Sequence, residues 1–396
     1  MSTRLRLAAG GAIAVRLVAA AVLLFGPWTD DPSELQGWDV ERFQEIADTA
    51  GTPYIDHEVE YPPLTVIVAE IVLADDVVSS HQRLVVVSLL IDLAVAAVLA
   101  RAFGPTAGAA YLVIGLPLVP SGLLRLDLWA GLAAVTAAAA VAGQQSSRHQ
   151  GSEERRTERR RRMMDRSTFA VMVTIGTMIK LWPALLIPAA VGIKRSKDAA
   201  AAVAMGTVAG VVWLTISGTA ALEQITSLRG VTGWHLESIP GSLIALFGTE
   251  SPRLEADAFR IGELDNTMVL IGRIAVLGLV AAATVLAQRS NRQPAERLAL
   301  VMLVSVAGLI ITAPLLSPQF LLWLTPWTAI VHRDRALVLL TFGAVGLTAV
   351  VLAAFGPPDL DHPVAAVGLL TRDGFVLALI GTGMKRLVTS DWFEYS

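Results

Sequence analysis

The chain contains no cysteine, which excludes disulfides, thiolate metal ligands and cysteine nucleophiles. Charged residues make up only 16% of the 396 residues, whereas soluble domains carry about 25%. A nucleotide-binding glycine loop, a Walker motif and an internal repeat are also absent from the sequence. A function driven by nucleotide hydrolysis in the cytosol is therefore not expected. Nor does the chain show the short alternating segments typical of a membrane β-barrel.

Long apolar runs take the place of the missing charge. Hydrophobic residues make up 54% of the chain, and the mean hydropathy is +0.60. Several runs, including 268–287 and 336–354, approach the roughly 20 apolar residues that span a bilayer as a helix. In lipid the backbone must satisfy its own hydrogen bonds, so these runs are predicted to be helices. The first run, 7–25, resembles a signal peptide but lacks a small-residue cleavage site, which favours a retained span.

The distribution of charge predicts the topology. Basic residues of short loops stay in the cytoplasm, whereas segment 27–60 has ten acidic residues and Arg42 as its one base, which places it outside. With residues 62–74 as an interfacial or re-entrant segment, both termini and every basic cluster fall in the cytoplasm. The twelve predicted spans are 7–26, 84–103, 105–121, 128–143, 167–179, 182–193, 198–218, 267–287, 298–314, 319–331, 336–354 and 364–383.

The prediction is thus an all-α polytopic protein of the plasma membrane, with one transmembrane domain over 1–396. Its first external loop covers 27–83 and should hold short juxtamembrane helices, and a second external loop covers 219–266. An Arg-rich stretch within 144–166 is read as a flexible cytoplasmic linker. Nucleic acid is not an expected partner.

The first external loop predicts a short helix over 39–50, with Asp39 at its N-cap and an apolar side that would lie on the membrane surface. That apolar side consists of Val40, Phe43, Ile46 and Ala47. Asp39 is either a plain cap or a catalytic carboxylate. The sequence Tyr61-Pro62-Pro63 then fixes an extended approach to the next apolar segment, because each proline restricts its predecessor.

Three residues that could bind phosphate lie in segments predicted to be external. Lys180 interrupts an apolar stretch, where it must either snorkel to the interface or pair with an anion. Arg229 could grip a phosphate with two hydrogen bonds, and His235 could donate to it or act as acid or base. The further candidates for substrate binding are Tyr61, Asp56, Arg125, Asp127, Trp182, Trp234, Glu237 and Gln319. Arg125 and Asp127 could equally form a local ion pair at the end of a span.

No cofactor is expected, and the histidines show no convincing metal-ligand spacing, so no metal site is assigned. A divalent ion held by external acidic residues stays an open alternative.

Four blocks together resemble the GT-C class of membrane glycosyltransferases, and most closely glycosyltransferase family 87, the actinobacterial polyprenyl-phosphate-mannose-dependent mannosyltransferases. The blocks are Trp38-Asp39 through Tyr61-Pro62-Pro63, Lys180-Leu181-Trp182-Pro183, Arg229-Gly230 through Ser238, and Ser317-Pro318-Gln319-Phe320. The resemblance implies a GT-C-like fold in which the acidic residue of the first external loop, here Asp39, is the catalytic base. Phe43 departs from the pattern, since relatives often have tyrosine there.

The resemblance also implies the reaction. A sugar, mannose by family, would pass from a polyprenyl-phosphate donor to a glycolipid or polysaccharide acceptor by an inverting single displacement, with membrane lipid around the site. Lys180, Arg229 and His235 would bind the donor phosphate, and Glu237, Asp56 and Asp127 are reserve bases. Arabinose and glucose stay open as donor sugars.

Two other functions are compatible with the sequence. A transporter or lipid flippase often carries ionisable residues within its spans, and Asp92 is such a residue. A GT-C protein that has lost its activity and acts as an assembly scaffold is the third possibility.

Overall fold

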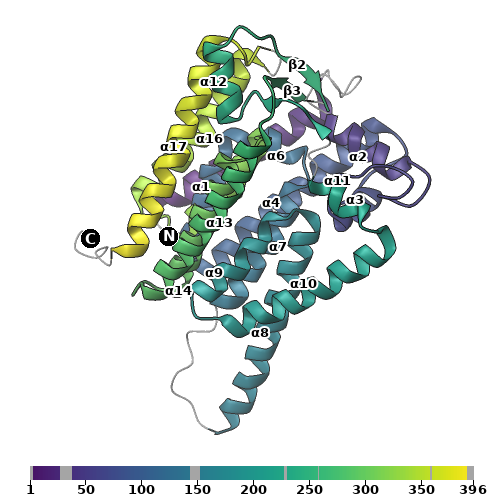
Figure 1. Cartoon of the computed structure of the whole chain (residues 1–396). Coiled ribbons are helices and arrows are strands. Elements are labelled where there is room, and N and C mark those ends of the chain that lie inside the picture. Colours follow the sequence, from purple (N-terminus) through teal and green to yellow (C-terminus); the bar gives the residue numbers. More distant parts are fainter. Residues whose placement is uncertain are drawn as a thin grey trace.

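The computed structural model describes residues 3–26, 38–142, 152–226, 230–256, 258–356 and 359–389. Helices dominate the described chain (Figure 1). The first half contains α1 (Thr3–Phe25), α2 (Trp38–Asp48), α3 (Pro63–Val72), α4 (Val77–Phe103), α5 (Pro105–Ile114), the 3-10 helix η3 (Leu116–Leu118), α6 (Val119–Leu123), α7 (Asp127–Ala142), α8 (Ser152–Ile179), η5 (Trp182–Leu185) and α9 (Leu186–Gly192). The second half contains α10 (Ser196–Ser217), α11 (Ala220–Thr226), β1 (Trp234–His235), α12 (Ile239–Phe247), β2 (Arg253–Glu255), β3 (Ala258–Ile261), α13 (Asn266–Arg289), α14 (Pro294–Ile311), η7 (Pro318–Leu324), α15 (Thr325–Ile330), α16 (Arg335–Phe355) and α17 (Pro363–Val388).

Within the described ranges, seven helices are long and apolar enough to cross a bilayer, namely α1, α4, α10, α13, α14, α16 and α17. An eighth span is possible if α5 and the helical segment after it, which bend by 51° at Gly115, form one crossing. The chain is therefore an all-α polytopic membrane protein. The predicted spans 128–143 and 167–179 lie in the unbroken helices α7 and α8. The predicted spans 182–193 and 319–331 each consist of a 3-10 helix and a short α-helix, with prolines such as Pro183 and Pro326 in them. The number of twelve crossings stays a prediction.

Burial separates the centre of the helical bundle from its lipid-facing rim. In α14 78% of the apolar window is buried inside the protein, whereas in α10 the figure is 11%. The exposed side chains of α10 include Val208, Val211 and Ile216. In water such a surface would be costly, but in a bilayer it meets hydrocarbon. Helix α10 is thus a peripheral span, and it lies at the margin of the bundle in Figure 1.

The predicted cytoplasmic clusters meet at one end of the bundle. Arg386 pairs with Asp334 at 2.9 Å, and Arg292 donates to the backbone oxygen of Arg386. Arg195 and Arg166 both pair with the buried Asp198 at the start of α10. This clustering agrees with the topology predicted from charge, although the sides of the membrane are not assigned by the structure.

The Arg-rich segment differs from the prediction. Residues 152–166 are the first part of the continuous helix α8, so this part is not a flexible linker, and residues 144–151 lie outside the described ranges. Glutamate, arginine and methionine, which dominate the segment, all favour helix. The apolar second half of α8 therefore extends without a break into its charged first half.

The short helix in the first loop is confirmed as α2, but its surroundings differ from the prediction. It begins at Trp38, so Asp39 lies in its first turn rather than at its N-cap. Val40 and Phe43 are buried at 0% and 1% exposure, and they pack on α3 and α4 through residues such as Ala69 and Leu84. The apolar side of α2 is therefore covered by protein and not by lipid. The adjoining helix α3 has 10 residues, which is too short to cross a bilayer.

The predicted external loop 219–266 is folded. It contains α11, α12 and a three-stranded antiparallel sheet in the order β1-β3-β2. Ile261 of β3 and Leu236, the residue after β1, pack with Val351 of α16 and with Leu369 of α17. Ser238 caps α12 by accepting from the amide of Gly241. The sheet region thus sits firmly on the end of the bundle opposite the basic clusters, as Figure 1 shows.

A buried ion pair joins the first membrane spans, and the sequence analysis identified one of its two residues. Arg16 of α1 donates to Asp92 of α4 at 2.5 Å, and Tyr111 of α5 donates to the other carboxylate oxygen at 2.5 Å. Arg16 also donates to the backbone oxygen of Leu112. The sequence prediction named Asp92 but missed Arg16, its partner 76 residues away. The pair joins three helices, which makes it a structural feature of the bundle.

Candidate functional site

A group formed by Tyr61, Lys180 and Asp127 lies where three segments meet. The Lys180 ammonium lies 4.7 Å from the centre of the Tyr61 ring and 3.7 Å from Asp127 Oδ2. Trp323 donates its indole N–H to Asp127 Oδ1 at 2.9 Å. Thr65 of α3 donates to the backbone oxygen of Ile179, which fixes the residue before Lys180. Lys180 is therefore paired and stacked rather than freely snorkelled.

Two contacts of the Asp127 carboxylate define its role in the site. It is 3% exposed, begins α7 and uses one oxygen for Trp323 and the other for Lys180. The positive end of the α7 dipole also stabilises a negative charge at this position. Asp127 is thus suited to hold Lys180 in place rather than to accept a substrate proton.

Helix α2 approaches the same group. The Phe43 ring centre lies 5.1 Å from that of Tyr61, and Asp39 precedes Phe43 by one helical turn. The Asp39 side chain is outside the described part of the structure. Tyr54 fixes the loop by donating its hydroxyl to the backbone oxygen of Tyr61 at 2.7 Å. The helix that carries the proposed base therefore packs against the residue on which Lys180 rests.

Trp323, the hydrogen-bond partner of Asp127, belongs to a group of stacked aromatic rings. Trp182 stacks with Trp323 at 5.5 Å between ring centres, and Phe320 stacks with Trp323 at 4.4 Å. Gln319 Oε1 and the indole nitrogen of Trp182 are buried without a hydrogen-bond partner among the described residues. Unpartnered buried polar atoms are costly, so the hydrogen-bonding capacity of these two atoms is unused within the described protein.

A second cluster lies where β1 meets α17. Arg372 is 0% exposed and pairs with Asp373 at 2.8 Å and with Glu237 at 3.4 Å. It also donates to the backbone oxygen of Glu237. Burial raises the pKa of Glu237 from 4.5 to about 7, although the charge of Arg372 acts in the opposite direction.

His235 is held in one form by the same surroundings. Burial, together with the positive charges of Arg260, Arg372 and Arg125, lowers the pKa of His235 from 6.5 to about 3. Its Nδ1 accepts from the amide of Glu237 at 3.3 Å, so the proton of the neutral ring is on Nε2. His235 is therefore a neutral hydrogen-bond donor near pH 7. Of the two roles that the sequence analysis left open, a donor to phosphate and an acid or base, these surroundings favour the donor.

The charge of Arg125 acts on the second cluster. Arg125 lies two residues before Asp127, and its charge lowers the pKa of both His235 and Glu237. The amide of His235 also donates to the backbone oxygen of Pro314, five residues before Gln319. Segments widely separated in sequence thus converge, and of the nominated residues they bring together Tyr61, Lys180, Arg125, Asp127, Trp182, His235, Glu237 and Gln319.

Four residues predicted for the site are not among those that the described structure brings together. Arg229 lies outside the described ranges, and of Asp39 only the backbone is described. Asp56 is exposed and accepts from the amide of Thr52 at 2.6 Å, which makes it a turn residue. Trp234 is buried at 5% exposure in strand β1, where it packs within the small sheet region.

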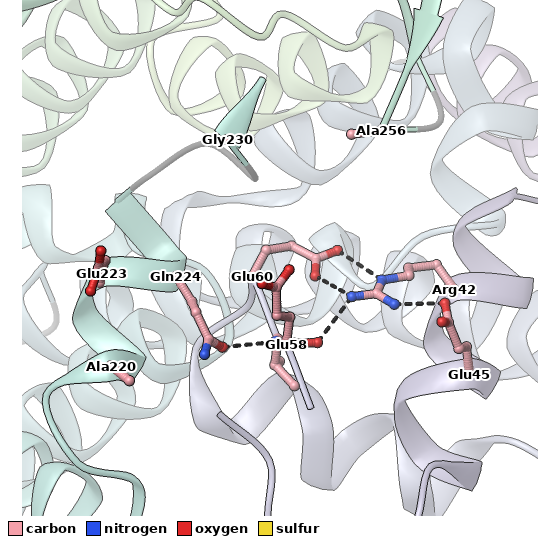
Figure 2. Close-up of a pocket in the computed structure, with 10 residues that line it drawn as sticks. Arg42, Glu45, Glu58, Glu60, Ala220, Glu223, Gln224, Gly230 and Ala256 are labelled. Carbon is pink, nitrogen blue, oxygen red and sulfur yellow. Dashed lines mark hydrogen bonds and ion pairs between the residues drawn. The ribbon is translucent and has the colours of Figure 1, made fainter. Parts of the chain in front are cut away.

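A pocket of about 550 Å³ opens between α2, the 58–60 segment and α11. It is lined by Arg42, Glu45, Glu58, Val59, Glu60, Ala220, Glu223, Gln224, Gly230 and Ala256. Figure 2 shows α11 on one side, α2 on the other and the 58–60 segment between them. Arg42 is next to Phe43 and Glu60 is next to Tyr61, so the pocket and the Lys180 group draw on the same two segments. Gly230 directly follows Arg229 in the chain.

Sequence reasoning missed Arg372, Asp373 and Trp323. The pair Arg372-Asp373 lies within a predicted span, and charged residues at such depth are a signal that was available. Trp323 carried no such signal, because a tryptophan in an apolar run is usually core. Only the fold shows that its N–H reaches Asp127.

No protein-family model matches the chain, and no curated protein sequence matches it. A solved structure that it resembles in outline is that of ArnT from Cupriavidus metallidurans in the apo state. The TM-score is 0.46 and the identity 14%, over 94% of this chain and 76% of the ArnT chain. A similarity of this degree leaves the family and the function of the chain open.

Proposed function

We propose that the chain is a GT-C-class membrane glycosyltransferase that transfers a sugar from a polyprenyl-phosphate donor to a hydroxyl of a glycolipid or polysaccharide. The observation that carries this proposal is the position of Lys180. It is a cation held by Asp127 and by the Tyr61 ring, next to the helix that carries Asp39. Mannose is the proposed sugar, and this choice rests only on the resemblance of the sequence to glycosyltransferase family 87.

The cationic side of the site suits the leaving group. When the bond from the sugar C1 to the phosphate oxygen breaks, a phosphodiester becomes a phosphomonoester and gains negative charge. Cations placed there stabilise the transition state more than the ground state. Lys180 and Arg229 are the proposed cations, and Arg125 lies two residues before Asp127, the partner of Lys180. His235 would donate a neutral hydrogen bond from Nε2.

Asp39 is the proposed base. The acceptor hydroxyl loses its proton as its oxygen forms the new bond to C1, and a carboxylate positioned against that oxygen takes the proton. A single displacement with inversion needs one such carboxylate. Glu237 is a poor alternative, because it is buried against Arg372. Asp127 is already bound to Trp323 and Lys180.

The test is Asp39→Asn, assayed in nanodiscs for sugar transfer from polyprenyl-phosphate-mannose. A loss of about 10²-fold or more in turnover is expected, as for removal of a general base. Asp48→Asn is the matched control, since Asp48 is exposed at the other end of the same helix. Turnover of Asp39→Asn close to wild type would remove Asp39 as the base.

A transporter or flippase is the competing function, and the ion pair within the spans bears on it. Asp92 and Arg16 are buried, and each is bound by further groups from a third helix. A fully satisfied pair of this kind favours a static structural role over an ion pathway. Movement of a fluorescent polyprenyl phosphate across proteoliposomes, without sugar transfer, would instead support transport.

A further inference from the structure

The pocket beside α2 carries a strong excess of negative charge. Among its lining residues Glu45, Glu58, Glu60 and Glu223 are acidic, and Arg42 is the one basic residue. With these groups ionised the lining sums to −3. A volume of about 550 Å³ is within the roughly 300–1,000 Å³ of small-molecule sites.

Arg42 does not offset this charge for an incoming ligand. Its Nη1 donates to Glu45 at 2.6 Å, and its Nε and Nη2 donate to the two oxygens of Glu60 at 3.3 and 2.9 Å. Nη2 also donates to the backbone oxygen of Glu58 at 3.0 Å. Figure 2 shows the guanidinium enclosed by these partners. The one cation of the pocket lining is therefore already neutralised by two carboxylates.

Two carboxylates are left to meet a ligand. Glu58 and Glu223 are exposed, and neither side chain forms an ion pair among the described residues. They come from two adjoining walls, the 58–60 segment and α11, which the hydrogen bond from the Val59 amide to Gln224 joins (Figure 2). Carboxylates accept hydrogen bonds from hydroxyl groups and repel other anions. No three described acidic or histidine side chains are grouped as metal ligands.

We propose that this pocket binds the hydroxyl-rich head of the acceptor and selects heads without negative charge. This assignment rests on the proposed function and adds that the acceptor carries no negative charge on its head group. Two lining residues, Arg42 and Glu45, belong to α2, the helix that carries Asp39. Another lining residue, Glu60, directly precedes Tyr61 in the chain. A head group bound there lies against α2, the helix that carries Asp39, and a phosphate or carboxylate on that head would face Glu58 and Glu223.

The test compares octyl mannoside with its 6-phosphate and its 6-amino analogue. Binding to the full chain in nanodiscs, without donor, is measured by calorimetry at low salt. The neutral and amino compounds are expected to bind at least about tenfold more tightly than the phosphate, because unit charges a few ångströms apart repel appreciably near a protein surface. The preference should shrink in 0.5 M salt, where screening is stronger. Equal binding of the phosphate would overturn the proposal.

The double variant Glu58→Gln/Glu223→Gln locates the selectivity. The ratio of neutral to phosphate affinity should fall by about five- to tenfold, whereas Glu250→Gln, at an exposed carboxylate outside the pocket lining, should leave it unchanged. An unchanged ratio in the double variant would place the selectivity elsewhere and refute the assignment.

A transfer assay with polyprenyl-phosphate-mannose and the same compounds separates the two proposals. If wild-type protein transfers to none of them but still prefers the uncharged heads in binding, the proposed function fails and the pocket assignment stands. Transfer to the phosphate as efficient as to the neutral compound would refute the pocket assignment alone.

Discussion

Protonation of Glu237 should make the stability of the protein depend on pH. Burial raises the pKa of Glu237 from 4.5 to about 7, so the folded state holds this proton more tightly than the unfolded state. Its contribution to the free energy of unfolding is therefore fully present below about pH 4.5 and is lost as the pH rises through about 7. At about 1.36 kcal/mol per pH unit, the loss amounts to about 3 kcal/mol.

Glu237→Gln should remove this dependence. Glutamine resembles the protonated carboxyl, and Arg372 keeps Asp373 at 2.8 Å as its charged partner. Between pH 5 and 8.5 the wild-type Tm should fall by roughly 5 °C more than that of the variant. Tryptophan fluorescence during heating in detergent measures both proteins, and Glu250→Gln, at an exposed carboxylate, is the control.

Protonation of His235 changes the stability with pH in the opposite direction, and the comparison of the two proteins cancels this contribution. Its lowered pKa contributes stability above about pH 6.5 that is lost as the pH falls toward 3. Since both proteins contain His235, the difference between their curves reports Glu237. Parallel curves for wild type and Glu237→Gln would refute the reasoning, because they would mean that the buried carboxyl keeps the same pKa in the folded and unfolded states.

Three further substitutions test the structure. Arg16→Leu leaves Asp92 as an unpaired buried charge and should lower stability by about 3–5 kcal/mol; the Arg16→Leu/Asp92→Leu double variant should recover most of the loss in Tm, and no recovery would argue against the pair. Asp127→Asn keeps an acceptor for Trp323 but removes the charge beside Lys180, so polyprenyl phosphate should bind about threefold more tightly in a fluorescence titration; weaker binding would contradict this. Tyr54→Phe loses one buried hydrogen bond and should lower the unfolding free energy by about 1 kcal/mol, with an unchanged Tm as the opposing result.

Much of the fold could be predicted from local patterns. Apolar runs identified the helices, and the spacing of Val40 and Phe43 identified the buried side of α2. A non-crossing segment at 62–74 was expected because a crossing there would place the later basic loops outside, and α3 in this segment has 10 residues. The elements that cover the apolar side of α2 were not predictable, since an apolar helix side is equally consistent with lipid and with protein.

The sequence by itself determined that the protein is a helical membrane protein and which residue types could bind phosphate. These properties follow from hydropathy, charge and helix period, which act within one or two turns of chain. The tertiary structure alone decided the partners. It placed Lys180 on Asp127 and Tyr61, and it buried His235 so deeply that it is neutral. Contacts between segments far apart in the chain depend on packing and desolvation, which leave no periodic trace in the sequence.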